Sequence, residues 1–160
     1  MNLLFWKQQE LNKKIKLPML CDETNFYKTF IKDLLHARKE VIIESPFVTT
    51  RRVETLFSIF ESLLRKGVRI YIITRPPEEH NRNMQIEAQQ EIDKLLSIGV
   101  SVIFCYGSHH RKLAIVDRDI LWEGSLNILS QNYSREIMKR IETQQEVQQM
   151  FSFLKLDSII

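Results

Sequence analysis

A short stretch in the last third of the chain, residues 108–127, gathers side chains that can act on a phosphate group. The residues concerned are His110, Lys112, Asp117, Gly124, Ser125 and Asn127. An imidazole can attack phosphorus or give a proton to a leaving oxygen, and a lysine can hold a non-bridging oxygen. Hydroxyl and amide groups add neutral donors for the charge of the transition state. The residue types therefore indicate phosphoryl chemistry, provided that the fold brings them together.

The apolar run that follows His110 predicts a β-strand. Along a strand, side chains alternate between faces, so His110 and Lys112 are expected on one face and Arg111 and Asp117 on the other. Asp117 should then have a structural role in the turn rather than a direct part in catalysis. Of the two adjacent histidines, His109 and His110, only His110 has the parity to act together with Lys112.

A two-residue turn at Arg118 and Asp119 would join this strand to "ILWEGSLN". That register sets Lys112 opposite Ser125 and His110 opposite Asn127, whereas a longer turn or a break at Gly124 would shift it. Gly124 would also allow the backbone to come close. The apolar side of the hairpin, which is expected to pack the fold, comprises Leu113, Ile115, Ile120 and Trp122.

The elements that must position these residues follow an alternating pattern. Three β-branched runs predict strands at about 41–45, 68–74 and 100–105, with segments of helical spacing between them, each followed by a glycine, Gly67 or Gly99, at the C-cap position. This order is the signature of a parallel β-α-β unit. A capped amphipathic helix, with Phe26, Phe30, Leu34 and Leu35 on its apolar side, precedes the first strand. A strand at 136–141 and a closing helix at 143–155 follow the hairpin.

The chain of 160 residues fits one domain, which we place at 21–157. Residues 1–20 are interpreted as an N-terminal extension or linker; a short helix over Phe5–Lys14 would fit, and Pro18 makes "IKLPML" a poor central strand. The beginning "MNLLFWKQQELNKK" suits a domain cut from a longer chain and a small independent protein equally well.

Composition bounds the class of protein. Hydrophobic residues make up 44% and charged residues 27%, as in ordinary globular domains, and the net charge of +3 is compatible with phosphate-bearing partners. The apolar run at Leu3–Trp6 is too short for a signal peptide, and no stretch is long enough to cross a bilayer. Cys21 and Cys105 match no metal or redox spacing, which favours a reducing compartment. A cytoplasmic location is therefore expected.

The spacing His110-x-Lys112-x4-Asp117, followed by Gly124-Ser125-x-Asn127, resembles the HKD motif of the phospholipase D superfamily. The segment from "FYKTFIKDLL" through "VIIESPF" to "VRIYIITRPPEEH" is similar to phospholipase-D-like domains attached to helicases and found in restriction-type nucleases. The resemblance covers about residues 20–155. It implies an α/β fold with a phospholipase-D-like mixed sheet flanked by helices, in one domain.

The resemblance also implies roles for individual residues. His110 would be the nucleophile that forms a phosphohistidine, Lys112 and Asn127 would bind phosphate, and Ser125 would supply supporting hydrogen bonds. Glu136 stands where the family has a glutamate that orients a histidine, although an ordinary strand-edge acid is the alternative. No metal and no cofactor are implied, because the lysine and the neutral donors replace the cation that most nucleases use.

In such enzymes a second histidine, from another HKD motif, protonates the leaving oxygen, but this chain has a single motif. His36 and His80 lack a lysine two positions on, and His109 faces the other way. The second imidazole is therefore expected from a second copy of the chain, in a homodimer with a shared site.

Arg51, Arg52 and Arg75 follow two of the predicted strands and could overhang the site as substrate-binding residues; the alternative is that they are solvated charges. The leading hypothesis is a metal-independent nuclease, with DNA expected ahead of RNA, either alone or as part of a larger helicase or restriction-type protein. A phospholipase or phosphatidyl transferase, which should carry an apolar surface near the site, is one alternative. A non-catalytic nucleic-acid-binding or dimerisation domain is the other.

Overall fold

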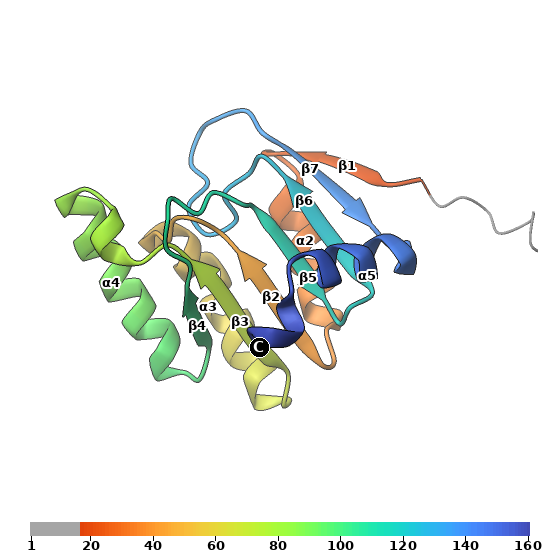
Figure 1. Ribbon diagram of the computed structural model, residues 1–160, viewed down its shortest axis with the longest axis horizontal. Coiled ribbons are helices and arrows are strands. Elements are labelled where there is room, and N and C mark those ends of the chain that lie inside the picture. The colour runs from red at the N-terminus through yellow and green to blue at the C-terminus, as the bar shows by residue number, and fades with distance from the viewer. Residues whose placement is uncertain (1–16) are drawn as a thin grey trace, which may run out of the picture.

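The computed structural model describes residues 17–160, so the helix considered over Phe5–Lys14 lies outside the described residues. These residues form a mixed seven-stranded sheet in the order β1-β7-β6-β5-β2-β3-β4 (Figure 1). The strands β2, β3 and β4 are parallel, and the remaining neighbours pair antiparallel. The strands are β1 (Met19–Asp22), β2 (Glu40–Glu44), β3 (Arg69–Thr74), β4 (Ser101–Phe104), β5 (Leu113–Val116), β6 (Ile120–Gly124) and β7 (Ile137–Ile141).

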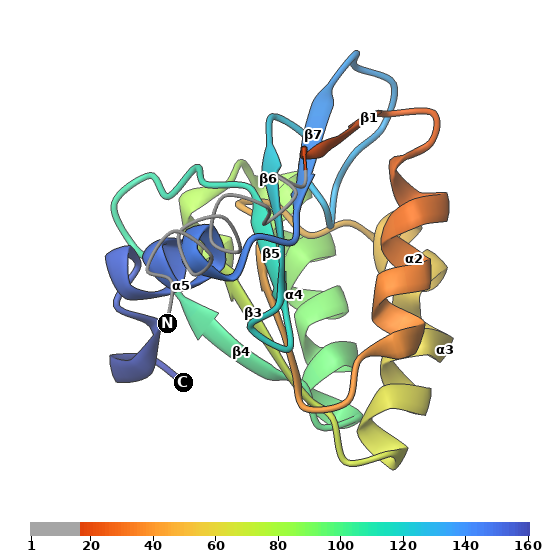
Figure 2. The same cartoon turned by 90° about the vertical axis from the view of Figure 1, so that its right-hand side faces the viewer.

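Helices cover both faces of the sheet. On one face lie α2 (Phe26–His36), α3 (Thr50–Arg65) and α4 (Arg82–Ser97), and on the other lies α5 (Gln144–Phe153), as Figure 2 shows. Two 3-10 turns, η1 (Pro77–Glu79) and η2 (Leu156–Ser158), complete the described elements. The predicted α/β fold with a mixed, helix-flanked sheet is confirmed.

The predicted β-α-β unit is also confirmed. The strands β2, β3 and β4 lie within one or two residues of the predicted ranges, with α3 and α4 between them. Gly67 and Gly99 end these helices with φ of 80° and 101°, the left-handed conformation that glycine adopts without a steric cost.

The helix α2 is fastened to the sheet by packing and by a buried carboxylate. Phe26 and Phe30 lie 5.2 and 6.0 Å from the ring of Trp122 on β6. Asp33 accepts hydrogen bonds from Trp122 Nε1 (2.8 Å) and Arg140 Nε (2.7 Å). Leu35, predicted on the apolar side, is half exposed, because Asp33 and Leu34 occupy the buried face. The expected side-chain cap is absent as well, since Asn25 at the N-cap makes no capping hydrogen bond.

The predicted hairpin register is wrong by one residue. Val116 pairs with Ile120, so the turn has three residues, and the first two, Asp117 and Arg118, adopt φ of 55° and 61°. Regular pairing begins at Leu113, opposite Glu123. Consequently, Lys112 is not opposite Ser125, and His110 is not opposite Asn127. The carbonyl oxygen of Lys112 accepts instead from Gly124 N, at 3.3 Å.

The hairpin has no single packing side, contrary to expectation. Leu113 and Ile115 belong to the core cluster beneath α5, whereas Trp122 and the partly buried Ile120 belong to the cluster with α2 and α3. The strand β5 is central in a sheet covered on both faces, so both of its faces are apolar.

The sheet begins two residues before the predicted domain boundary at 21. The strand β1 pairs with β7 through Met19, Leu20, Cys21 and Asp22, at the edge of the sheet. An edge position is where a neighbouring proline is tolerated, and Pro18 directly precedes the strand. Within the described residues, no helix combines the length and the apolar character needed to cross a membrane.

Candidate active site

The two halves of the sequence motif meet at one end of the sheet. There β2 and β6 end while β5 and β7 begin, since Glu44 pairs with Leu113 and Ser125 N donates to the carbonyl oxygen of Ile137 at 2.9 Å. Two loops, 105–112 and 125–136, cover this end (Figure 1). The topology therefore gathers residues from both sides of the β5-β6 hairpin.

His110 and Lys112 are in contact. Lys112 Nζ lies 2.8 Å from Nδ1 of His110 and 2.8 Å from its carbonyl oxygen. Both residues line a cavity of about 690 Å³ together with Ser125. Partial burial lowers the pKa of the Lys112 ammonium, and the negative charge of Glu136 opposes this shift. The expected closeness of the motif histidine and lysine is thus present.

The other motif residues lie around this pair with different contacts. Ser125 Oγ accepts from Ile137 N (3.1 Å), and Ser134 Oγ donates to the carboxylate of Glu136 (2.7 Å). Asn127 is not among the residues that line the cavity; its Oδ1 is buried and has no hydrogen-bond partner among residues 17–160. In the same residues no hydrogen bond joins Glu136 to a histidine, so this glutamate acts on the pair through the charge of Lys112.

Gly124 lies directly against β7. A Cβ atom at this position would collide with the carbonyl oxygen of Ile137 and crowd Met138. The close backbone approach expected of the motif glycine is therefore made to β7, and it holds Ser125 against the start of that strand.

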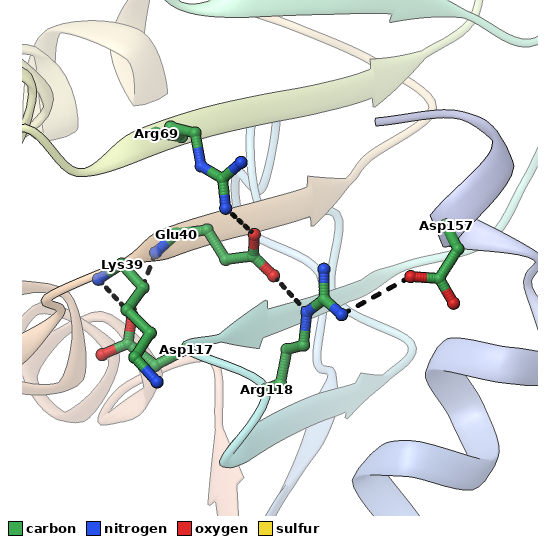
Figure 3. Close-up of polar contacts among 6 residues, drawn as sticks. All are labelled: Lys39, Glu40, Arg69, Asp117, Arg118 and Asp157. Carbon is green, nitrogen blue, oxygen red and sulfur yellow. Dashed lines mark hydrogen bonds and ion pairs between the residues drawn. The ribbon is translucent and has the colours of Figure 1, made fainter.

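Asp117 lies at the opposite end of the sheet from His110. Its carboxylate accepts from the backbone N–H groups of Arg38, Lys39 and Glu40, at 2.8, 2.7 and 3.0 Å. In Figure 3 these contacts adjoin a chain of ion pairs that runs from Arg69 through Glu40 and Arg118 to Asp157. Asp117 therefore fixes the hairpin turn to the start of β2 and contacts none of the phosphate-binding candidates.

A buried carboxylate lies behind the loop that carries His110. Glu44 is 0% exposed, and its Oε2 lies 2.7 Å from Arg111 Nε and 3.5 Å from His109 Nε2. Burial, together with the positive charge of Arg111, lowers the pKa of His109 to about 4, so this imidazole is neutral near pH 7. Burial raises the pKa of Glu44, and Arg111 opposes the shift.

Arg111 was expected to face away from Lys112, but both line the same cavity. The reason is that residues 108–112 precede the first regular residue of β5, and the alternation of faces holds only within a strand. The alternation of faces expected from the sequence therefore placed the Arg111 cation on the wrong side, away from His110 and Lys112.

A second carboxylate holds the same loop from its other side. Glu79 accepts from the N–H groups of Gly107 and Ser108, at 3.0 and 3.3 Å, and these two residues adopt φ of 83° and 62°. These hydrogen bonds, that of Gly107 first, lower the pKa of Glu79. Arg75 Nε donates to Glu79 at 3.2 Å, so this predicted substrate-binding arginine is engaged within the protein.

An aromatic ring connects two histidines beside the site. The ring of Phe47 lies 5.1 Å from that of His80 and 6.3 Å from that of His110, and Arg75 Cζ lies 5.6 Å from its centre. Burial lowers the pKa of His80, with Arg75 contributing. The sequence contains no spacing signal that would have placed His80 here, because it reaches the site from η1.

Arg51, the other predicted substrate-binding residue, contacts the loop that follows Asn127. It donates to Asn132 Oδ1 at 2.8 Å, and its Cζ lies 5.2 Å from the ring centre of Tyr133. Arg52 Nε donates to the carbonyl oxygen of Gln131 at 2.6 Å. Both arginines thus tie α3 to the loop 125–136. Across residues 17–160, no group of three or more His, Cys, Asp and Glu side chains is placed to hold a metal ion.

A mixed sheet with helices on both faces, and a His-x-Lys pair that directly precedes β5, the antiparallel neighbour of β2, define a phospholipase-D-like domain. The family model described as "Cardiolipin synthase, PLD-like domain" matches residues 30–155, and the chain belongs to this family. Membership supports phosphodiesterase activity in general terms. A comparison with curated proteins gave no significant match.

Solved structures share the fold at low sequence identity. NucT from Helicobacter pylori is 19% identical, with a TM-score of 0.70, 86% of this chain covered and 92% of that chain. Nuc from Salmonella typhimurium, a phospholipase D family member, is 12% identical, with a TM-score of 0.68 and the same coverage. Phosphatidylserine synthase from Haemophilus influenzae is 17% identical, with a TM-score of 0.60, 89% of this chain covered and 37% of that chain.

Proposed function

We propose that the protein is a nuclease that cleaves a phosphodiester of nucleic acid through a covalent intermediate on His110. The observation that carries the proposal is the contact between Lys112 Nζ and His110 Nδ1, 2.8 Å apart on the wall of a cavity shared with Ser125. An imidazole and an ammonium side by side supply a nucleophile and a phosphate ligand in one place.

In the free protein, the charged Lys112 is a donor only, so it donates to Nδ1 of His110. A bound phosphate competes for Nζ with its non-bridging oxygens. A ring nitrogen of His110 then attacks phosphorus, the P–N bond forms, and the P–O bond to the leaving group breaks as that oxygen takes a proton from a second imidazole. Water next attacks phosphorus, returns a proton to the second imidazole and releases His110.

We assign the second imidazole to His110 of a second copy, in a homodimer with a shared site. The motif occurs once in the chain, and His36 lies on the exposed side of α2. Exposed apolar side chains line the same cavity as His110: Leu20 is 69%, Ile137 63% and Phe153 77% exposed. A second copy that covered these side chains would also face the nucleophile.

The test is cleavage of single- and double-stranded DNA, and of RNA, in the presence of EDTA. Wild-type protein should cleave DNA, His110→Ala should not, and His36→Ala, the same substitution at an exposed histidine, should retain activity. Acid-labile phosphate trapped on His110 would identify the intermediate. Lack of cleavage by the wild type, or retained cleavage by His110→Ala, would overturn the proposal; DNA binding without cleavage would favour a binding domain.

A second candidate is phosphatidyl transfer or phospholipid hydrolysis by the same pair. It is favoured by the apolar lining of the cavity beside His110, which comprises Leu20, Leu113, Ile137, Met150, Phe153 and Leu154. An acyl chain could lie against these side chains while Lys112 held the phosphate. Release of headgroup from phosphatidylglycerol vesicles, with no cleavage of nucleic acid, would select this function over the first.

A further inference from the structure

We propose that Arg111 binds a second phosphate of the substrate, adjacent to the one held by Lys112. This inference rests on the proposed nuclease function, because a polynucleotide carries a phosphate on each side of the one that is cleaved. It assigns an anion-binding role to a residue that the strand pattern had placed on the scaffold side.

The first support is the place of Arg111. It lines the same cavity as His110, Lys112 and Ser125, with a side chain that is 44% exposed. Lys139 lines this cavity as well, and its Nζ is only loosely paired with Glu123, at 3.7 Å. The volume of the cavity, about 690 Å³, falls in the range of roughly 300–1,000 Å³ that is usual for pockets holding a whole small-molecule ligand. It can therefore accept more than a single phosphate group.

The second support is the ion pair that holds one edge of the guanidinium. Arg111 Nε lies 2.7 Å from a carboxylate oxygen of Glu44, which is completely buried at the end of β2. Among residues 17–160, this ion pair through Nε is the one polar contact of the Arg111 guanidinium, and both oxygens of Glu44 are without a hydrogen bond. Glu44 thus holds the Nε edge of the guanidinium by charge and leaves the two terminal Nη groups available. Arginine binds phosphate through such paired, directed N–H groups.

The charges around the guanidinium determine how Arg111 would bind a phosphate. Glu44 has one charged partner, Arg111, because His109 is neutral near pH 7. Burial raises the pKa of Glu44, and in its ionised form Glu44 offsets the charge of Arg111. Arg111 therefore contributes directed, charge-assisted hydrogen bonds, while Lys112 supplies positive charge that no carboxylate of the cavity wall offsets, since Glu123 of the same wall is paired with Lys139. The role of Arg111 therefore depends on the planar shape of its guanidinium group as well as on its positive charge.

The test compares a substrate with several phosphates and one with a single phosphate. Arg111→Gln should lower kcat/KM for an oligothymidylate about tenfold more than for bis(4-nitrophenyl) phosphate, mostly through KM, since a hydrogen bond to a charged group is worth roughly a factor of ten or more. Arg111→Lys should restore only part of the loss. Arg65→Gln removes the same charge at the far end of α3 and serves as the control.

Two further measurements separate binding from folding. Binding of oligothymidylate to inactive His110→Ala should lose about 0.7 from its log–log salt slope when Arg111→Gln is added, the value for one phosphate contact on a single strand. Glu44→Gln should raise KM in the wild-type background and change little further in Arg111→Gln, because both act through one guanidinium.

The outcomes are distinct. Equal losses on both substrates, or an unchanged salt slope, would overturn the assignment of Arg111 while the nuclease function stood. Wild-type protein that cleaved bis(4-nitrophenyl) phosphate but no oligonucleotide would overturn the nuclease function, and with it this inference.

Discussion

At the scale of single residues, the site depends on which side chains are charged. Lys112 and Arg111 are cations beside His110, and the two groups behind them, Glu44 and His109, are buried. His109 is held neutral by burial and by neighbouring positive charges. Because His109 is neutral, it does not compete as a cation for Glu44. The ion pair between Glu44 and Arg111 then holds Arg111 in place.

This arrangement predicts a specific pH dependence of stability. The pKa of His109 is about 4 in the folded protein and near 6.5 when unfolded, so the unfolded chain binds more protons between these values. The stability that the neutral His109 imidazole contributes is therefore complete above about pH 6.5 and is lost as pH falls toward about 4, by roughly 3 kcal/mol in total. The raised pKa of Glu44 has the opposite sign, and His110, Lys112 and Arg75 add positive charge nearby.

Thermal denaturation from pH 4 to 7 checks this prediction. His109→Gln should flatten the fall in Tm on acidification, whereas His36→Gln, at an exposed histidine, should follow the wild type. Parallel curves for His109→Gln and the wild type would mean that His109 takes up its proton as easily in the folded protein as in the unfolded chain.

Three residues of the candidate site could be foreseen from the sequence, but their surroundings could not, and Asn127, predicted to join them, does not line the cavity. The spacing of His110, Lys112 and Ser125 identified three residues that do share a cavity. The face of Arg111 and the nearness of His80 were missed, because the loop before β5 takes its shape from distant carboxylates rather than from strand alternation. Local patterns describe regular elements well and irregular segments poorly.

At the scale of elements, the loop 105–112 is held between two carboxylates, Glu79 from η1 and Glu44 from β2. Gly107 and Ser108 have positive φ, which is costly for the serine. The hydrogen bonds from their N–H groups to Glu79 stabilise this backbone. The position of His110 therefore depends on Glu79, an acidic residue that lies outside the sequence motif.

Replacement of Glu79 should impair catalysis more than stability. Glu79→Ala is expected to lower kcat by up to about a hundredfold, since a misplaced catalytic group can cost that much, with KM changed less. The adjacent, exposed Glu78→Ala serves as the control. Hydrogen exchange of the Gly107 and Ser108 amides should accelerate only in Glu79→Ala; unchanged exchange together with unchanged kcat would contradict the role of Glu79.

Replacement of Asp117, in the hairpin turn at the opposite end of the sheet, should impair stability more than catalysis. Asp117→Ala removes the acceptor of three backbone N–H groups and should destabilise the protein by about 2 to 3 kcal/mol, as expected for hydrogen bonds to a charged group. Cleavage by the folded fraction should persist, because Asp117 lies far from the cavity. Chemical denaturation of Asp117→Ala and of Asp119→Ala, a substitution at an exposed residue of the same turn, checks this prediction. Equal denaturation midpoints for the two variants would show that the hydrogen bonds of Asp117 do not stabilise the fold.

At the scale of the whole molecule, the fold could be predicted further than the site. Alternating hydrophobic runs indicated the parallel strands and their helices, since burial on both faces leaves a clear pattern. The order of the antiparallel strands could not be foreseen, because β1 and β7 pair across 115 or more residues without a local signal. The resulting sheet places the single motif histidine, His110, at an exposed, partly apolar end, so the proposed mechanism with two imidazoles depends on how many chains form the active species.

A shared site predicts how activity depends on mixing. If each catalytic unit needs His110 from two copies, only dimers of two wild-type chains are active. After exchange with His110→Ala, activity per total protein should therefore fall as the square of the wild-type fraction, so that an equal mixture retains about a quarter. Mixing with His36→Ala should leave activity unchanged, and sedimentation should show His110→Ala to be dimeric. A linear fall with the wild-type fraction would mean that each chain works alone, and the second imidazole would then have to come from the same chain, where His80 is the histidine that reaches the ring beside His110.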